Sequence, residues 1–320
     1  MNKTTEKERI YWIDWVKSMA IAMVVWAHIS LFLKKEIFLF HMPLFFLVSG
    51  YLYHKRGIWG EAKTILLSLV FPYLIYNLFY ILPLPMGGEF KHDTIPNILL
   101  GNQEKLCYVM QPLWFIVSLI MMRLLCMSRL RIEVIGLVCL IVSFVLGGVE
   151  GLQECDYFQW RTTVLCFPFF CVGWIWRSYF NFCIPFKKTV LIIILLVVFV
   201  GATIGGMYNS EHWQHGLNVF HCRIGKNILF FYVVAFTMSI TFMCLCRLLL
   251  NVKCIIIERL SKGTLLILAT HLIIFWKIPK LPIPDILQQL CSLVIVMLIS
   301  YLLIVLSERY CPILIGKRKK

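Results

Sequence analysis

Three ionisable side chains lie inside one apolar stretch near the N-terminus, where such groups are rare. Asp14, Lys17 and His28 all fall within residues 11–33. In a helix, Lys17 and His28 would differ by about 20° around the axis and lie about 16 Å apart along it, with Asp14 within about 40° of His28. One stripe of a helix would therefore carry a carboxylate, an amine and an imidazole, which together suit proton transfer, nucleophilic attack or anion binding.

The elements that position these residues are predicted to be membrane helices. Of 320 residues, 60% are hydrophobic and 15% are charged, and the mean hydropathy is +0.83. This is more apolar surface than one soluble core can bury. Inside a bilayer every backbone polar group must bond within its element, and the apolar runs are too long for barrel strands. We therefore expect an all-α integral membrane protein.

Ten apolar runs have the length that a bilayer requires, roughly 20 residues each. The predicted spans are residues 11–33, 37–53, 62–82, 112–127, 132–149, 160–178, 188–208, 227–249, 263–277 and 283–307. The gaps on the predicted cytoplasmic side are short. We therefore expect residues 1–320 to form a single transmembrane domain, a bundle of about ten helices.

The placement of basic residues gives the predicted spans a direction. The net charge is +15, and most lysines and arginines lie in the N-terminal tail, the even-numbered gaps and the C-terminus. The positive-inside bias then predicts that both termini are cytoplasmic, which requires an even number of spans. Because the charge follows topology, we expect the lipid bilayer as a partner and no nucleic acid.

The second predicted span carries a motif that, with the first, is similar to a known family. Lys17 precedes His28 by eleven positions, and FHMPLFFLVSGY follows at residues 40–51. Further segments come in order: KTILLSLVFPY at 63–73, PLWFI at 112–116, RTTVLCFPFFCVG at 161–173 and GTLLILATH at 263–271. Together they resemble the acyltransferase 3 family of membrane O-acyltransferases, and look closest to its fucose 4-O-acetylase-like branch.

The resemblance implies a helical bundle that takes an acyl group, usually acetyl, from cytoplasmic acyl-CoA to a hydroxyl of a cell-surface or lipid-linked carbohydrate. The family's characteristic basic residue and histidine map onto Lys17 and His28. The family more often has arginine at the first position, so Lys17 keeps the charge but lacks the bidentate fork for phosphate. Acetyl-CoA would be a donor substrate, and we expect no tightly bound cofactor.

We predict that Asp14, Lys17 and His28 are catalytic. Acyl transfer to a hydroxyl needs a group that removes its proton near neutral pH, and histidine suits that task. His28 would be the general base or a transient acyl carrier. Lys17 and Lys63 would attract the phosphates of coenzyme A, and Asp14 would orient a partner or pair with Lys17. In a plainer interpretation, Asp14 and Lys17 reach the inner interface and His28 is a core histidine.

Six residues are predicted to bind substrate: His41, Ser49, Lys63, Trp114, Arg161 and His271. Under this topology all histidines except His54 fall in the outer half or outer gaps, which favours an outward-facing acceptor site. Five of the six also have a structural alternative. These are interfacial packing beside Pro43 for His41, close helix approach for Ser49, the aromatic belt for Trp114, a headgroup anchor for Arg161, and a core position for His271.

Three other histidines, His212, His215 and His221, have a spacing loosely like that of metal ligands. No carboxylate-rich shell accompanies them. We interpret this segment as a solvated loop that faces the acceptor, and we predict no metal.

Two other classes of function fit the same stripe. Asp14, Lys17 and His28 would serve a proton or substrate relay in a transporter or flippase as readily as catalysis. A catalytically inactive sensor on the same scaffold is the other alternative, and saturable binding of acyl-CoA would separate an acyltransferase from a transporter. The short cytoplasmic loops and the KRKK tail favour a multi-pass protein of a bacterial inner membrane, and the sequence leaves open whether it forms homo-oligomers.

Overall fold

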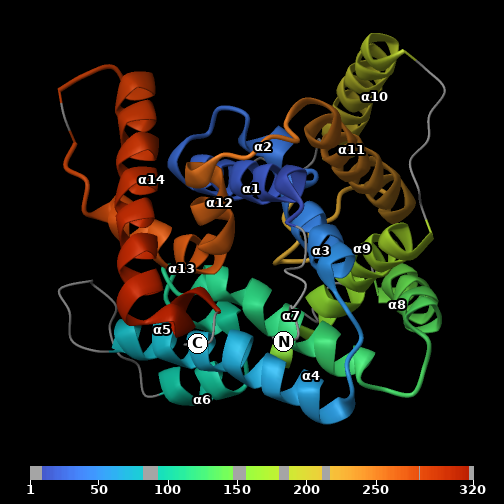
Figure 1. Ribbon diagram of the computed structural model, residues 1–320, viewed down its shortest axis with the longest axis horizontal. Coiled ribbons are helices and arrows are strands. Elements are labelled where there is room, and N and C mark those ends of the chain that lie inside the picture. Colours follow the sequence, from blue (N-terminus) through green and yellow to red (C-terminus); the bar gives the residue numbers. More distant parts are fainter. Residues whose placement is uncertain are drawn as a thin grey trace, which may run out of the picture.

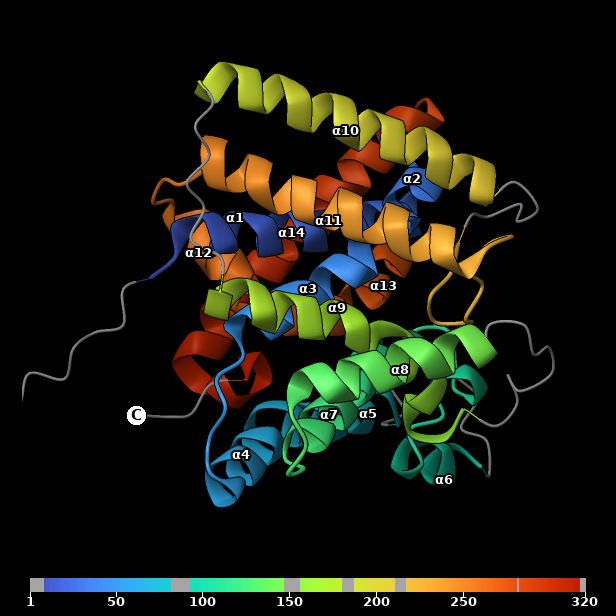
Figure 2. The ribbon, with the colours of Figure 1, turned by 90° about the vertical axis from the view of Figure 1, so that its right-hand side faces the viewer.

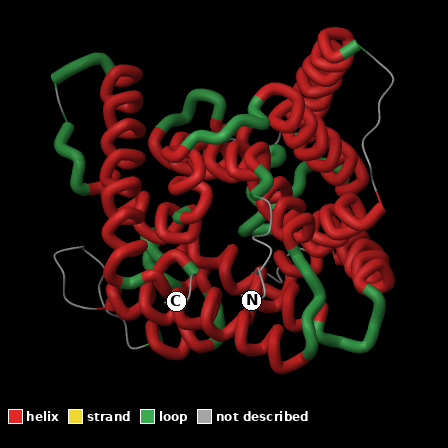
Figure 3. The backbone as a smooth tube through the Cα atoms, viewed as in Figure 1, coloured by secondary structure: helices red, strands yellow, loops and turns green. Residues whose placement is uncertain are grey.

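The computed structural model describes residues 9–81, 93–146, 156–179, 187–210, 217–280 and 282–316. Within these ranges the regular structure is helical, apart from one isolated β-bridge between Asn218 and Arg223. Figure 3 shows helices joined by loops throughout. The prediction of an all-α protein is confirmed.

Every predicted span coincides with a helix or a run of helices. The first half of the chain forms α1 (Tyr11–Ile29), α2 (Lys34–Phe38), α3 (His41–Leu52), α4 (Ile58–Ile65), a π-helical turn (Leu66–Val70), α5 (Phe71–Ile81), α6 (Thr94–Leu99) and α7 (Trp114–Cys126). The second half forms α8 (Ile132–Leu146), α9 (Trp160–Tyr179), α10 (Lys188–Asn209), α11 (Ile228–Leu249), α12 (Ile255–Lys262), α13 (Thr264–Trp276) and α14 (Asp285–Tyr310).

Several of these helices are long and apolar enough to cross a membrane. In the described part of the chain, five segments meet that criterion, namely Lys34–Leu52, Ile58–Ile81, Lys188–Asn209, Ile228–Leu249 and Asp285–Tyr310. The pair α12 and α13, bent by 82° at Gly263, would be a sixth if it forms one broken span. The protein is thus an integral membrane protein, while ten crossings and two cytoplasmic termini stay predictions.

The helices stack in layers. In Figure 2, α10 lies outermost against α11, the middle contains α1, α3 and α9, and α8 lies with α4 to α7 on the far side. Figure 1 shows α14 along one edge, beside α12 and α13. Apolar side chains on the outer helices face outward, and Val197 of α10 and Leu302 of α14 are 66% and 61% exposed. Lipid is the solvent that such surfaces require.

The closest helix contact in the middle layer joins α3 and α9. A Cβ atom added to Gly50 would overlap the carbonyl oxygen of Phe170, and one added to Gly173 would overlap that of Leu47. Small residues allow two helix backbones to approach in this way. Gly50, next to Ser49, therefore has a packing role.

We predict that Gly50→Ala destabilises the protein, because the added methyl group has no space between α3 and α9. Overpacking of this kind costs about 1–3 kcal/mol, so the melting temperature in nanodiscs should fall by about 5 °C. The matched control is Gly201→Ala in α10, where a Cβ would meet nothing within 4 Å. Equal melting temperatures for the two variants would contradict the close contact.

Candidate active site

Two cavities lie along α1, and Lys17 and His28 line one each. The cavity that contains Lys17 has a volume of about 360 Å³, and the cavity that contains His28 has a volume of about 240 Å³. Met42 of α3 and Leu268 of α13 line both, so the two cavities share a wall. We call them the basic cavity and the histidine cavity, after the side chains described next.

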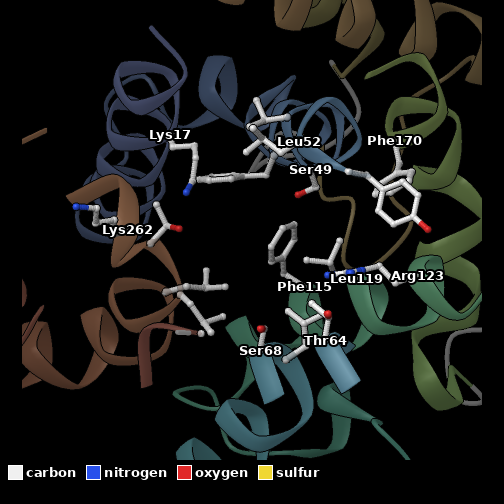
Figure 4. Close-up of a pocket in the computed structure, with 18 of the residues that line it drawn as sticks. Lys17, Ser49, Leu52, Thr64, Ser68, Phe115, Leu119, Arg123, Phe170 and Lys262 are labelled. Carbon is white, nitrogen blue, oxygen red and sulfur yellow. The ribbon is translucent and has the colours of Figure 1, made fainter. Parts of the chain in front are cut away.

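The basic cavity combines positive charge with hydroxyl groups. Its basic lining residues are Lys17, His54, Arg56, Arg123 and Lys262, and no aspartate or glutamate occurs among the described residues that line it. Figure 4 shows Ser49, Ser68 and Arg123 around a common open space, with Lys17 on another side of it. The amine of Lys262 points away from this space and lies 2.6 Å from Oε1 of Glu258. A cavity of this kind suits an anionic ligand with hydrogen-bonding groups.

Both arginines that line the basic cavity are held by one buried carboxylate, which does not itself line the cavity. The side chain of Glu61 in α4 is 1% exposed, and its Oε1 lies 2.5 Å from Nη2 and 2.6 Å from Nε of Arg123. Its Oε2 lies 3.6 Å from Nη1 of Arg56. The guanidinium of Arg123 also lies over the ring of Tyr53, 5.6 Å from its centre. Two guanidinium groups share one carboxylate, so this cluster keeps a net positive charge at the cavity.

Ser261 at the end of α12 is bound by both charged residues of the α1 stripe. Its hydroxyl donates to Oδ1 of Asp14 over 2.6 Å, and its carbonyl oxygen accepts from Nζ of Lys17 over 2.5 Å. Asp14 is also bound by Nε and Nη2 of Arg9, at 2.6 and 3.0 Å. Asp14 lines neither cavity, so its observed contacts join α1, Arg9 and α12.

His28 lies in the last turn of α1 and lines the histidine cavity. Its Nδ1 is 3.2 Å from the hydroxyl of Tyr108. Its ring centre is 5.1 Å from that of His271, which is 1% exposed and lies behind it in α13. The hydroxyl of Tyr108 can hold the imidazole of His28 in one orientation, which a base or nucleophile requires.

Two histidines near His28, His41 and His271, each have a defined tautomer when they are neutral. Nδ1 of His41 is 2.8 Å from the carbonyl oxygen of Ile37, and Nδ1 of His271 is 3.0 Å from that of Ile267. A carbonyl oxygen only accepts hydrogen bonds, so Nδ1 carries the proton in each ring. The Nε2 atoms of His41 and His271 are therefore acceptors; His41 lines the histidine cavity, whereas the Nε2 of His271 is buried and His271 lines neither cavity.

Of the other residues predicted to bind substrate, some line a cavity and others do not. His41 and Trp114 line the histidine cavity, and Ser49 lines the basic cavity. Trp114 stacks on Phe220 with ring centres 5.6 Å apart, so one of its faces is already covered. Lys63 is exposed and lines neither cavity.

Arg161 also lines neither cavity. It is 8% exposed and lies beside Asp156. Its backbone N–H donates to Oδ1 of Asp156 over 3.0 Å, and the Thr162 hydroxyl lies 3.3 Å from Oδ2. Burial raises the pKa of the Asp156 carboxyl, while these hydrogen bonds and the charge of Arg161 act in the opposite direction. Asp156 thus binds the first turn of α9.

The structure adds residues that sequence reasoning missed. Arg123 is the only charged residue of α7. Lys17 was singled out as an ionisable residue inside an apolar stretch, and the same criterion could have found Arg123. Tyr108 and Arg223 line the histidine cavity from connecting segments and Lys34 from the start of the short helix α2, where spacing carries no such signal. His221, which the sequence placed in a loop facing the acceptor, lines the same cavity. His212 and His215 lie outside the described residues, so their predicted loop role stays a prediction.

An all-helical membrane protein with two adjoining polar cavities suits transfer of a group between two substrates. Residues 10–305 match the family model described as an acyltransferase domain, that of acyltransferase 3. The chain belongs to the acyltransferase 3 family, and the resemblance drawn from its motifs is confirmed at family level. No curated protein and no solved structure matches the chain. The narrower fucose 4-O-acetylase-like assignment stays a prediction.

We predict that Glu61→Ala strongly destabilises the protein. It removes the carboxylate between Arg123 and Arg56, and breaking a buried ion pair costs about 3–5 kcal/mol. The matched control is Glu308→Ala, because Glu308 and Arg259 form a more exposed pair whose atoms are 3.6 Å apart. Exposed pairs contribute about 0–1 kcal/mol. Thermal unfolding in nanodiscs measures both, and similar losses would contradict the buried cluster.

Proposed function

We propose that the protein transfers an acyl group, with acetyl as the first candidate, from cytoplasmic acyl-CoA to a carbohydrate hydroxyl. The acceptor would be a cell-surface or lipid-linked glycan of a bacterial inner membrane. The observation that supports this most is the shared wall of Met42 and Leu268, which separates a basic cavity containing Lys17 from a histidine cavity containing His28.

The basic cavity fits the donor. Coenzyme A carries phosphates, and guanidinium groups bind phosphate oxygens in a bidentate manner that lysine does not offer. Arg56 and Arg123 would supply this fork, which compensates for the lysine at position 17. The apolar part of the lining, including Ile21, Phe45 and Leu119, would contact the pantetheine arm and direct the thioester to the shared wall.

The histidine cavity fits the acceptor and the chemical step. The acceptor hydroxyl gives its proton to the imidazole of His28 as its oxygen attacks the thioester carbonyl. The C–O bond of the ester forms, the C–S bond breaks, and the proton passes to the departing sulfur, which leaves as free coenzyme A. If His28 instead carries the acyl group, its nitrogen attacks the thioester carbonyl, the C–S bond breaks and coenzyme A leaves as a thiolate. The acceptor hydroxyl then attacks the acyl-imidazole, the C–N bond breaks, and the hydroxyl proton passes to the thiolate.

Tyr108 and His271 would assist His28 in either mechanism. The Tyr108 hydroxyl contacts Nδ1 of His28, which leaves Nε2 of that ring for the reaction. The nearby His271 ring offers an acceptor nitrogen when neutral, as its Nδ1 contacts to the Ile267 and Leu268 carbonyls indicate. A relay through Asp14, as a transporter would need, has less support because Arg9 and Ser261 bind that carboxylate.

We predict that His28→Ala abolishes transfer without abolishing donor binding, since Lys17 and the arginines line the other cavity. With radiolabelled acetyl-CoA and nanodisc-embedded protein, label transfer to a panel of cell-surface glycans should fall at least about a hundredfold. Acetyl-CoA affinity and the melting temperature serve as controls for folding and should be unchanged. His28→Gln tests whether a polar side chain of similar size is enough, and it should also be inactive.

Two results would contradict this proposal. If wild-type protein does not bind acetyl-CoA or another acyl-CoA, the acyl-CoA donor is wrong. If His28→Ala transfers label at the wild-type rate, the role of His28 is wrong, although the donor assignment would stand.

A further inference from the structure

Among the described residues that line the histidine cavity, the lysine and arginine side chains have no acidic counterpart. Lys34 and Arg223 line it together with His28, His41 and His221, and no aspartate or glutamate occurs among the described residues that line it. Five acidic residues on the same predicted outer side lie in the described part of the chain, namely Glu36, Asp93, Glu104, Asp156 and Asp285, and none of them lines the cavity. The fold places them elsewhere, so the positive wall does not follow simply from a shortage of acids.

Arg223 is placed by a tight loop. Asn218 and Arg223 form the isolated β-bridge, with Asn218 N to Arg223 O at 2.8 Å and Arg223 N to Asn218 O at 2.9 Å. The Asn218 side chain accepts from the backbone N–H of Phe220 over 3.1 Å, inside the loop. These contacts use the backbone of Arg223 and the side chain of Asn218.

Lys34 approaches the cavity from a different element. It is the first residue of α2, and its Nζ lies 5.4 Å from the ring centre of Phe38. Phe38 stacks on His41 with ring centres 5.0 Å apart. This stack places an ammonium group, an aromatic ring and an imidazole in sequence along the same cavity as His28.

One acidic residue, Glu104, contacts a histidine of this wall. Oε1 of Glu104 is 3.1 Å from Nδ1 of His221, and Glu104 does not line the cavity. Burial lowers the pKa of His221, and the charge and hydrogen bond of Glu104 oppose this. Glu104 therefore orients the imidazole of His221, and the cavity lining itself remains cationic.

We propose that the acceptor is anionic, with a carboxylate or phosphate group that Lys34 and Arg223 bind while its reacting hydroxyl lies at His28. This deepens the proposed acyltransferase function and rests on it. A cleft lined by charges of one sign attracts and orients the opposite charge, and charge-assisted hydrogen bonds are the stronger ones. The amide groups of Gln111 and Asn218, which also line the cavity, would bind neutral hydroxyls.

The test compares matched acceptors that differ only in charge. In one arm, an oligosaccharide containing uronic acids is compared with its carboxyl methyl ester. In the other, a neutral oligosaccharide linked to prenyl diphosphate is compared with the same oligosaccharide free. The first arm detects a carboxylate of the glycan and the second a phosphate of the lipid carrier. We expect kcat/KM to favour the anionic form by about tenfold or more in at least one arm, equivalent to about 1.4 kcal/mol.

Substitutions assign the preference to the two cations. Lys34→Gln and Arg223→Gln should each reduce kcat/KM for the anionic acceptor, mainly through a higher KM, and change it little for the neutral acceptor. The double variant should remove the preference. Lys35→Gln is the matched control, because Lys35 is the next residue of α2 and does not line the cavity.

The outcomes separate this inference from the proposed function. Equal kcat/KM for charged and neutral acceptors in both arms would overturn the anionic acceptor and leave the acyltransferase proposal intact. Equal losses on both acceptors in the variants would also overturn it, since the cations would then act on folding or on His28. Absence of both acetyl-CoA binding and label transfer in wild type would overturn the proposed function itself.

Discussion

The arrangement of the active site depends on the contact of Ser261 with α1. Ser261 binds Asp14 through its hydroxyl and Lys17 through its carbonyl group. Within two residues the chain breaks at Gly263 and turns by 82° from α12 into α13. A side chain at position 263 would overlap Ile304 of α14. The break thus holds Lys262 and Thr264 at the basic cavity, and α13 continues with Leu268 and Leu272 to the histidine cavity.

This contact satisfies a general requirement of the bilayer. Ionisable groups among apolar helices are costly unless they are partnered, and backbone groups freed at a helix break need partners as well. Lys17 meets both needs, because its ammonium group donates to the carbonyl of Ser261. Glu61 and Arg123 follow the same rule on the other side of the basic cavity. Charges that are held in this way line the cavity at fixed positions, as phosphate binding would require.

Much of the fold could be predicted from the sequence because a bilayer restricts the choices. Apolar runs of sufficient length must be helices, and each predicted span coincides with described helices. The bend between α12 and α13 was not predicted, and the close approach of Gly263 to Ile304, a residue of α14 far along the chain, does not follow from spacing. Close helix approach was an alternative for Ser49, but the contact of the adjacent Gly50 with Phe170 depends on how α3 and α9 pair.

The candidate site was predictable in part. Placement of Lys17 and His28 on one stripe agrees with their positions in two cavities that share Met42 and Leu268. Four of the predicted residues line neither cavity, namely Asp14, Lys63, Arg161 and His271. The sequence could not show this, because helix periodicity indicates which face a residue occupies but not what lies opposite. Tyr108 and Arg223 reach the site from connecting segments and Lys34 from the five-residue helix α2, and the three-dimensional course of such elements does not follow from periodicity.

The central claim is that donor and acceptor meet across this wall from opposite faces of the membrane. The most direct test uses sealed proteoliposomes with radiolabelled acetyl-CoA outside and an acceptor glycan enclosed. Molecules with their cytoplasmic face outward should label the enclosed glycan, and detergent should not be needed for transfer. Labelling only when donor and acceptor share one compartment would contradict the account.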